Sequence, residues 1–134
     1  MSVGGWAQKA VFERLLLNAD VARLVGNRIY DGAPADPEFP YITFGPVDLL
    51  EDDAEDIPGA LETLQIDIWS RAGGRTREAL DIAFAVRAAI RQFQAPLPSG
   101  ALAQLEIALG RVFPDEDGRT IHGVIVCEMK LEET

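Results

Sequence analysis

The segment Thr63–Leu80, TLQIDIWSRAGGRTREAL, places the strongest constraint on how this chain folds. Its first half alternates apolar and polar side chains, as in a strand that buries one face. The apolar face consists of Leu64, Ile66 and Ile68. Trp69 falls on the opposite face, away from the predicted core. SRAGGR then turns the chain into a helix with Thr76 as its N-cap, which lasts until about Phe93. The pattern therefore predicts a strand, a tight connection and a helix.

The predicted helix has an apolar arc and, outside it, a second stripe. The arc that docks on the sheet consists of Ala79, Ile82, Ala83, Val86, Ala89, Ile90 and Phe93. Leu80 and Phe84 fall outside this arc, on the side that should face water. Aromatic residues and arginine are enriched in buried protein contacts, so we interpret the stripe as a subunit or partner interface. The predicted interface comprises Trp69, Arg71, Leu80, Phe84, Arg87 and Arg91. The alternative is that these are ordinary exposed residues.

The other segments predict an α+β domain. A first helix runs from about Trp6 to Asn18 and continues as a short helical turn that ends at Gly26. A proline-rich connection without regular structure leads to a strand, FPYITFGPV. The chain ends in a long hairpin, with Leu105, Ile107 and Leu109 inward on one arm and Ile121, Ile125, Cys127 and Met129 inward on the other. The order α-β-β-α-β-β predicts a single domain over 1–134. It has a mostly antiparallel four-stranded sheet and two main helices on one face.

Charge is distributed unevenly along the chain. The formal net charge is −10, which argues against a protein that grips a phosphate backbone. The segment 48–58 offers little to bury and repels itself, so we predict a flexible acidic loop there. Its acids are Asp48, Glu51, Asp52, Asp53, Glu55 and Asp56. Five arginines lie between Arg71 and Arg91. The two regions either attract each other between copies of the chain or are separate solvated surfaces.

The residues give no support for catalysis. His122 is the only histidine and Cys127 the only cysteine, too few for a metal site of those two residue types. SRAGGRTRE has glycines and arginines before a helix but lacks the Gly-Lys-Ser/Thr of a phosphate-binding loop. We therefore predict no catalytic residue, cofactor or metal. Nothing approaches about 18 consecutive apolar residues, so no membrane span is expected. The N-terminal pattern predicts an amphipathic helix and not a signal peptide.

Three segments in order resemble a known protein family. RLLLNADVARLVGNRIYDGAPADPEFPYITFG contains a helix ending in LVGNRIY, a proline-rich loop and the strand PYITFG. TLQIDIWSRAGGRTREALDIAFAVRAAI places the strand TLQIDIWSR before an alanine-rich helix, and a terminal hairpin follows. This order resembles the tail completion, or tail terminator, proteins of long-tailed phages, prophages and gene transfer agents. The resemblance extends from about Phe12 to Met129 and rests on the ordered set of features.

The resemblance implies a structural virion protein of the tail or neck, not an enzyme, assembled in the bacterial cytoplasm. Such proteins form a hexameric ring that stops polymerisation of the tail tube and joins it to the head-side stopper or connector protein. The partners are then the chain itself, the tail tube protein and that head-side protein. DNA passes through the central channel without sequence-specific binding. The acidic loop would face either the lumen or a partner.

Three other functions compete with this prediction. One is another neck component, such as a stopper or a connector adaptor. A second is an acidic decoy that mimics DNA, although a decoy would spread its acids in duplex-like rows. A third is a small hydrolase or binding enzyme, which needs a convergent polar site that the sequence does not supply.

Overall fold

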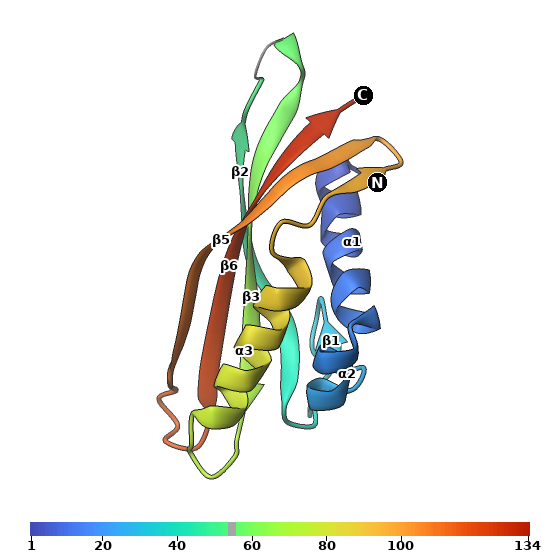
Figure 1. Cartoon of the computed structure of the whole chain (residues 1–134). Helices are drawn as coiled ribbons and strands as arrows, with labels where there is room; N and C mark the ends of the chain where they lie inside the picture. Colours follow the sequence, from blue (N-terminus) through green and yellow to red (C-terminus); the bar gives the residue numbers. More distant parts are fainter. Residues whose placement is uncertain (54–55) are drawn as a thin grey trace.

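The computed structural model describes residues 1–53 and 56–134, and within them six strands form one mixed sheet. The strands are β1 (Ile29–Tyr30), β2 (Tyr41–Glu51), β3 (Gly59–Ser70), β4 (Ala95–Leu97), β5 (Gly100–Pro114) and β6 (Ile121–Glu133). Their spatial order is β1-β2-β3-β6-β5-β4. β1 pairs parallel to β2, and all the other neighbours are antiparallel. Figure 1 shows that the long strands curl around the helices.

Three helices cover one face of this sheet: α1 (Val3–Leu17), α2 (Ala19–Val25) and α3 (Arg77–Ile90) (Figure 1). Asn18 separates the first two, because its backbone N–H caps the end of α1 through the Leu15 carbonyl. Its side-chain Oδ1 also accepts a hydrogen bond from the Val21 N–H at 3.0 Å, which caps the start of α2. One residue thus ends one helix and begins the next, so the N-terminal segment bends around the core.

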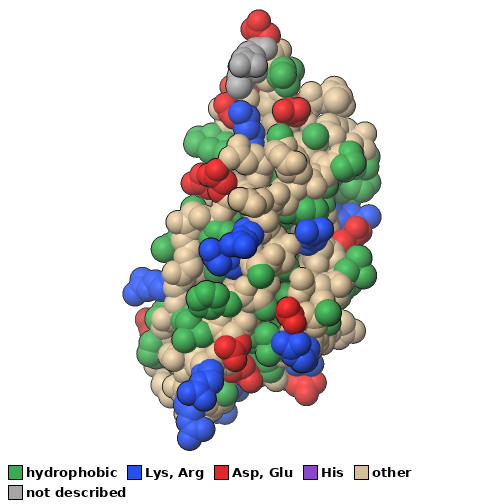
Figure 2. Space-filling model, viewed as in Figure 1, with side chains coloured by type: hydrophobic (Ala, Val, Ile, Leu, Met, Phe, Trp, Pro, Cys, Tyr) green, Lys and Arg blue, Asp and Glu red, His purple; other side chains and the backbone are tan. Residues whose placement is uncertain are grey.

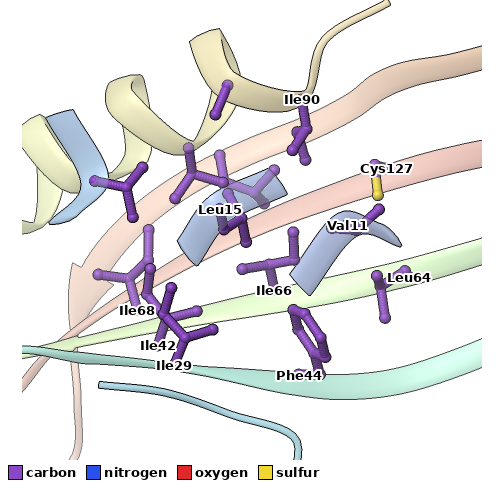
Figure 3. Close-up of a cluster of buried hydrophobic side chains, with 14 of the residues drawn as sticks. Val11, Leu15, Ile29, Ile42, Phe44, Leu64, Ile66, Ile68, Ile90 and Cys127 are labelled. Carbon is purple, nitrogen blue, oxygen red and sulfur yellow. The ribbon is translucent and has the colours of Figure 1, made fainter. Parts of the chain in front are cut away.

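The core lies between the helices and the sheet (Figure 3). Val11 and Leu15 of α1 and Ile90 of α3 point at the side chains of the central strands. The strand residues that they meet include Ile42, Leu64, Ile66, Ile68 and Cys127, each fully buried. On β6 the buried side chains are Ile121, Ile125, Cys127, Met129 and Leu131, at alternating positions. Period-two alternation on the strands and the apolar arc of α3 therefore produce one continuous core.

The predicted four-stranded sheet with two main helices is wrong. The described residues form six strands and three helices, in the order α-α-β-β-β-α-β-β-β. The additional strands are β1, which has two residues, and β4, which has three and contains Pro96. Both lie at the edges of the sheet, where a short or proline-containing segment needs hydrogen bonds on one side only. Such strands are too short to show a period of two, so the sequence pattern does not predict them.

Two local predictions are also wrong. Residues Asp48–Glu51 are not loop, because they continue β2 and pair with β3 as far as Ala60. The connection between the strands is shorter than predicted, and residues 54–55 within it lie outside the described part of the chain. On β5, Leu109 does not point inward: it is 52% exposed. The register shifts between Ile107 and Leu109, and such an irregularity turns the following side chains to the other face.

Candidate functional site

The exposed stripe of α3 lies beside an open groove. α3 buries its apolar arc on β3 and β6, which leaves Leu80 41% exposed and Phe84 64% exposed. Between α3 and β5 is a hollow of about 470 Å³, which we call the groove. It is lined by Leu80, Ala83, Phe84, Arg87, Ile107, Gly110, Arg111, Val112 and Ile125. The groove continues into a more polar hollow of about 720 Å³ that Arg87 and Arg91 line with Gln104.

The apolar base of the groove depends on a glycine. Gly110 of β5 pairs with Ile125 of β6, and a side chain at position 110 would meet Ile125 Cδ1 at 3.3 Å. The missing side chain leaves Ile125 to line the groove. One wall, Leu80 and Phe84, is predictable from the sequence, whereas the wall on β5 is not. Its only signal is the apolar pair Ile107 and Val112 around a glycine, which becomes a surface only when α3 is placed beside it.

The opposite face of the sheet carries an aromatic cluster. The Trp69 ring stacks on His122 with centroids 4.0 Å apart and on Tyr41 at 6.3 Å. Phe113 extends the row, 4.9 Å from His122. These residues are in register across β2, β3, β6 and β5. The Trp69 Nε1–H also donates to Thr43 Oγ1 at 3.0 Å, so the indole is held in place by its own chain. The cluster therefore connects four neighbouring strands on the uncovered face of the sheet.

Arg71 belongs to the same face as Trp69. Its guanidinium lies 4.2 Å from the Phe39 ring centroid, and its Nε–H donates to Thr120 Oγ1 at 3.1 Å. Its Nη2 is 3.8 Å from Asp117 Oδ2. Asp117 in turn accepts hydrogen bonds from Thr120 and Arg119, which lower its pKa to about 2. Arg71 thus ties the end of β3 to the β5–β6 connection.

The structure does not unite the six predicted interface residues. Leu80, Phe84 and Arg87 line the groove, and Arg91 lines the adjoining hollow. Trp69 instead belongs to the aromatic cluster on the uncovered face of the sheet, and Arg71 lies over the Phe39 ring beside it. The six residues therefore lie on two separate surfaces, and their role in an interface stays a prediction. Trp69 points away from the core, as the alternation predicts. Helix α3 covers the core face, so strand β3 lies between Trp69 and the exposed stripe of the helix.

The acidic residues lie at the far end of the β2–β3 hairpin, which projects beyond the rest of the sheet (Figure 1). We call Val47–Glu51 of β2 the arm. Asp48 and Glu51 are in its paired strand. Asp53 Oδ1 accepts a hydrogen bond from the Gly59 N–H at 3.1 Å, and Asp56 has φ +63°. Asp52 is bonded through its backbone N–H to the Gly59 carbonyl, and Glu55 lies outside the described residues.

The arm is also apolar, which the prediction overlooked. Leu49 is 65% exposed and Leu50 is 66% exposed. Their register partners on β3 are Glu62 and Leu61, so the two leucines point to opposite faces of the sheet. The signal was present in the sequence as two leucines inside DLLEDD, but the count of acids dominated the interpretation. Val47, which is 42% exposed, shares a face with Leu49, and adjacent exposed apolar residues beside charges are typical of interaction surfaces.

One buried carboxyl lies where the arm joins the core. Glu62 is 3% exposed, and its Oε2 has no hydrogen-bond partner among the described residues. Its neighbours are Met129 on β6 and Gly4 in the first turn of α1. Burial without a partner raises the pKa of Glu62 to about 7, because the charged form is poorly solvated there. The same burial, with Glu62 nearby, raises the pKa of the Cys127 thiol to about 12.

Among the described residues, the polar groups around His122 and Ser70 are paired within the fold and form no recognisable catalytic or metal site. His122 Nε2 lies 2.7 Å from Asp67 Oδ1, which also accepts from Gln65 Nε2 at 2.9 Å. Ser70 points to the helix side, where its hydroxyl donates to Glu78 Oε1 at 2.7 Å. Across residues 1–53 and 56–134, no three His, Cys, Asp or Glu residues are grouped so that they could hold a metal ion. No helix in this part of the chain is long and apolar enough to cross a membrane.

Two solved structures share this fold. One is a chain from the virion of a native gene transfer agent particle. It matches with a TM-score of 0.89 and 26% identity, over 98% of each chain. The other is the bacteriophage SPP1 gp17 protein, with a TM-score of 0.59 and 24% identity, over 91% of this chain and 86% of that chain. The second likeness concerns the fold alone.

The sequence identifies the family directly. The model of the tail completion protein gp17 family matches residues 9–132, so the chain belongs to this family. It is a structural protein of a tailed particle's virion, as the ordered segments of the sequence predicted. No curated protein sequence matches the chain.

Proposed function

We propose that the chain forms a hexameric ring that ends polymerisation of the tail tube and joins the tube to the head-side connector. Membership of the tail completion family supports a position at the end of the tail. The observation that carries the ring is the presence of two unlike exposed surfaces on one subunit, the arm and the groove. A closed ring repeats one heterologous interface, and that interface requires two different complementary surfaces on each copy.

The ring leaves a central channel through which DNA passes. The formal net charge of −10 suits such a channel, because an acidic wall repels the phosphate backbone and does not retain it. Sequence-specific binding to DNA is not part of this function. The acids of the β2–β3 hairpin are concentrated at one end of the molecule. This distribution disfavours a DNA-mimicking decoy, which would present acids in rows along a duplex-like surface.

Electron microscopy of negatively stained samples, with light scattering, tests the ring. The purified chain is examined alone and with its tail tube protein. We expect rings, or tubes that carry a cap at one end and stop growing. A chain that remains monomeric with tubes present and leaves their length unchanged contradicts the proposal. A ring that binds the head-side connector but not the tube indicates a different neck component.

A further inference from the structure

We propose that the arm of one copy lies in the groove between α3 and β5 of the next copy. This inference rests on the proposed ring and names the contact that closes it. Its occupant is a second copy of this chain, and not the tube protein or the lumen. The assignment follows from the shape, the apolar surface and the charge of the two regions.

The arm exposes apolar side chains on both of its faces and has an outer edge that pairs with no described strand. β1 pairs only with Ile42 and Thr43, so within the described residues no strand covers the outer edge of β2 along the arm. Leu49 and Leu50 are both about two-thirds exposed, at 65% and 66%, on opposite faces of that edge. A flat contact on one face of the sheet would cover only one of them. A slot with two sides covers both.

The groove provides such a slot. Its walls come from different elements, Phe84 and Leu80 on α3 and Val112 on β5, and the absent side chain of Gly110 deepens it. Phe84 is 64% exposed although it lies over an apolar surface. A buried aromatic side chain with apolar neighbours is a common centre of a protein interface. Insertion of leucine side chains would cover Phe84 and the base of the groove together.

Charge complements the apolar contact. The arm carries Asp48 and Glu51, and the groove and its adjoining hollow carry Arg87 and Arg91, besides Glu106 of β5. Neither arm acid and neither of these arginines has an ion-pair partner among residues 1–53 and 56–134. Figure 2 shows acidic side chains at the projecting end of the molecule and basic side chains over the middle of the same face. Arginine matches carboxylates geometrically, so these charges favour the arm and orient it.

The placement of the two surfaces suits a ring. β2 lies near one edge of the sheet, and β5 lies near the other. The arm and the groove are therefore on opposite sides of the subunit, so the arm of one copy cannot enter the groove of the same copy. A contact from one side of each copy to the other side of the next is heterologous, and it closes when the rotation between copies divides a full turn.

Cysteine cross-linking tests the contact. One variant carries Leu50→Cys in the arm and another carries Phe84→Cys in the groove, and the two are mixed with tail tube protein and oxidised. The native Cys127 is fully buried and does not compete. We expect cross-linked dimers in the mixture and none from either variant alone. A chain with both substitutions should give a ladder of products that ends at the closed ring.

The matched control is a mixture of Leu17→Cys and Phe84→Cys, because Leu17 is 85% exposed at the end of α1, away from the arm. Rings that form without cross-linking above this control overturn the docking alone. Maleimide protection of Leu50→Cys that depends on tube protein, without the cross-link, also overturns it and assigns the arm to the tube. Failure of the wild-type chain to form rings with tubes overturns the ring and this contact together.

Charge reversal gives a second measurement. Glu51→Arg and Arg87→Glu are each expected to weaken assembly by about tenfold or more at low salt, since each places like charges together. The two changes in one chain should restore assembly to within about threefold of wild type. Loss without recovery in the double variant contradicts the pairing. Circular dichroism confirms that each variant is folded.

Discussion

The two halves of strand β2 follow the same backbone ladder but differ in what covers them. Ile42 and Phe44, in the first half, are 0% and 8% exposed beneath the helices. Leu49 and Leu50, in the second half, are 65% and 66% exposed. The register shifts between Phe44 and Val47, where one half ends and the other begins. The chain therefore covers its own core on one side of this point and leaves apolar side chains exposed on the other.

The largest effect is expected in the buried half of β2. Ile42→Ala is expected to lower the free energy of unfolding by about 2–5 kcal/mol, because the loss of a fully buried side chain leaves a cavity. Leu49→Ala in the arm should change it by no more than about 0.5 kcal/mol. Urea unfolding followed by tryptophan fluorescence measures both. Equal effects of the two variants would show that the monomer covers both halves alike.

Glu62 lies at the junction between the two halves, and its burial should make the free energy of unfolding depend on pH. Its pKa rises from 4.5 to about 7 on folding, so the folded chain holds this proton more tightly than the unfolded chain. The stabilisation is complete below pH 4.5 and is lost as the pH rises through 7, a loss of about 3 kcal/mol. In urea unfolding measured across this pH range, Glu62→Gln should make the free energy of unfolding less dependent on pH. Glu106→Gln, at an exposed position, should leave that dependence unchanged. A slope unchanged by Glu62→Gln contradicts the assignment.

Trp69 of β3 packs against the first half of β2 on the uncovered face of the sheet. Trp69→Phe keeps an aromatic ring but removes the hydrogen bond to Thr43 Oγ1, at an expected cost of about 1 kcal/mol. In a chain that already carries Thr43→Val, the same change should cost less, since the acceptor is absent. Thermal and urea unfolding of the four chains measure this difference. Equal costs in both backgrounds would mean that the hydrogen bond contributes nothing.

The smallest expected effect on folding is at the groove. Phe84→Glu should change the free energy of unfolding by less than about 0.5 kcal/mol, because the side chain is already 64% exposed. The same variant should lose ring assembly, seen by light scattering. Ala88→Glu places an equal charge on an exposed position of α3 outside the groove and should assemble normally. Unfolding of the Phe84 variant would instead identify Phe84 as core.

Much of the central fold followed from local pattern. Leu64, Ile66 and Ile68 are buried as predicted, and so is the arc of α3 from Ala79 to Ile90. These segments are long enough for burial to impose a period on the sequence. The edge strands β1 and β4 and the break at Asn18 were missed, because they are short and depend on hydrogen bonds from neighbours. The irregularity in β5 reversed the side of Leu109 for the same reason.

The candidate site was predicted in part. The exposed positions of Leu80 and Phe84 could be derived from the helical period, because it needs no knowledge of other elements. Their separation from Trp69 could not, since it depends on which face of the sheet the helix covers. The apolar character of the arm was hidden by its acids, although the leucines are adjacent in DLLEDD.

By itself, the sequence determined the central strand, the helix that follows it, the acidic charge and the family. Each of these is written in contiguous residues, through periodicity, composition or the order of segments. Only the tertiary structure decided where the uncovered surfaces lie. It set β5 beside α3 to make a groove, carried β2 past the helices as an arm, and put Trp69 on the other face. These are relations between distant residues, which packing selects and local pattern does not record.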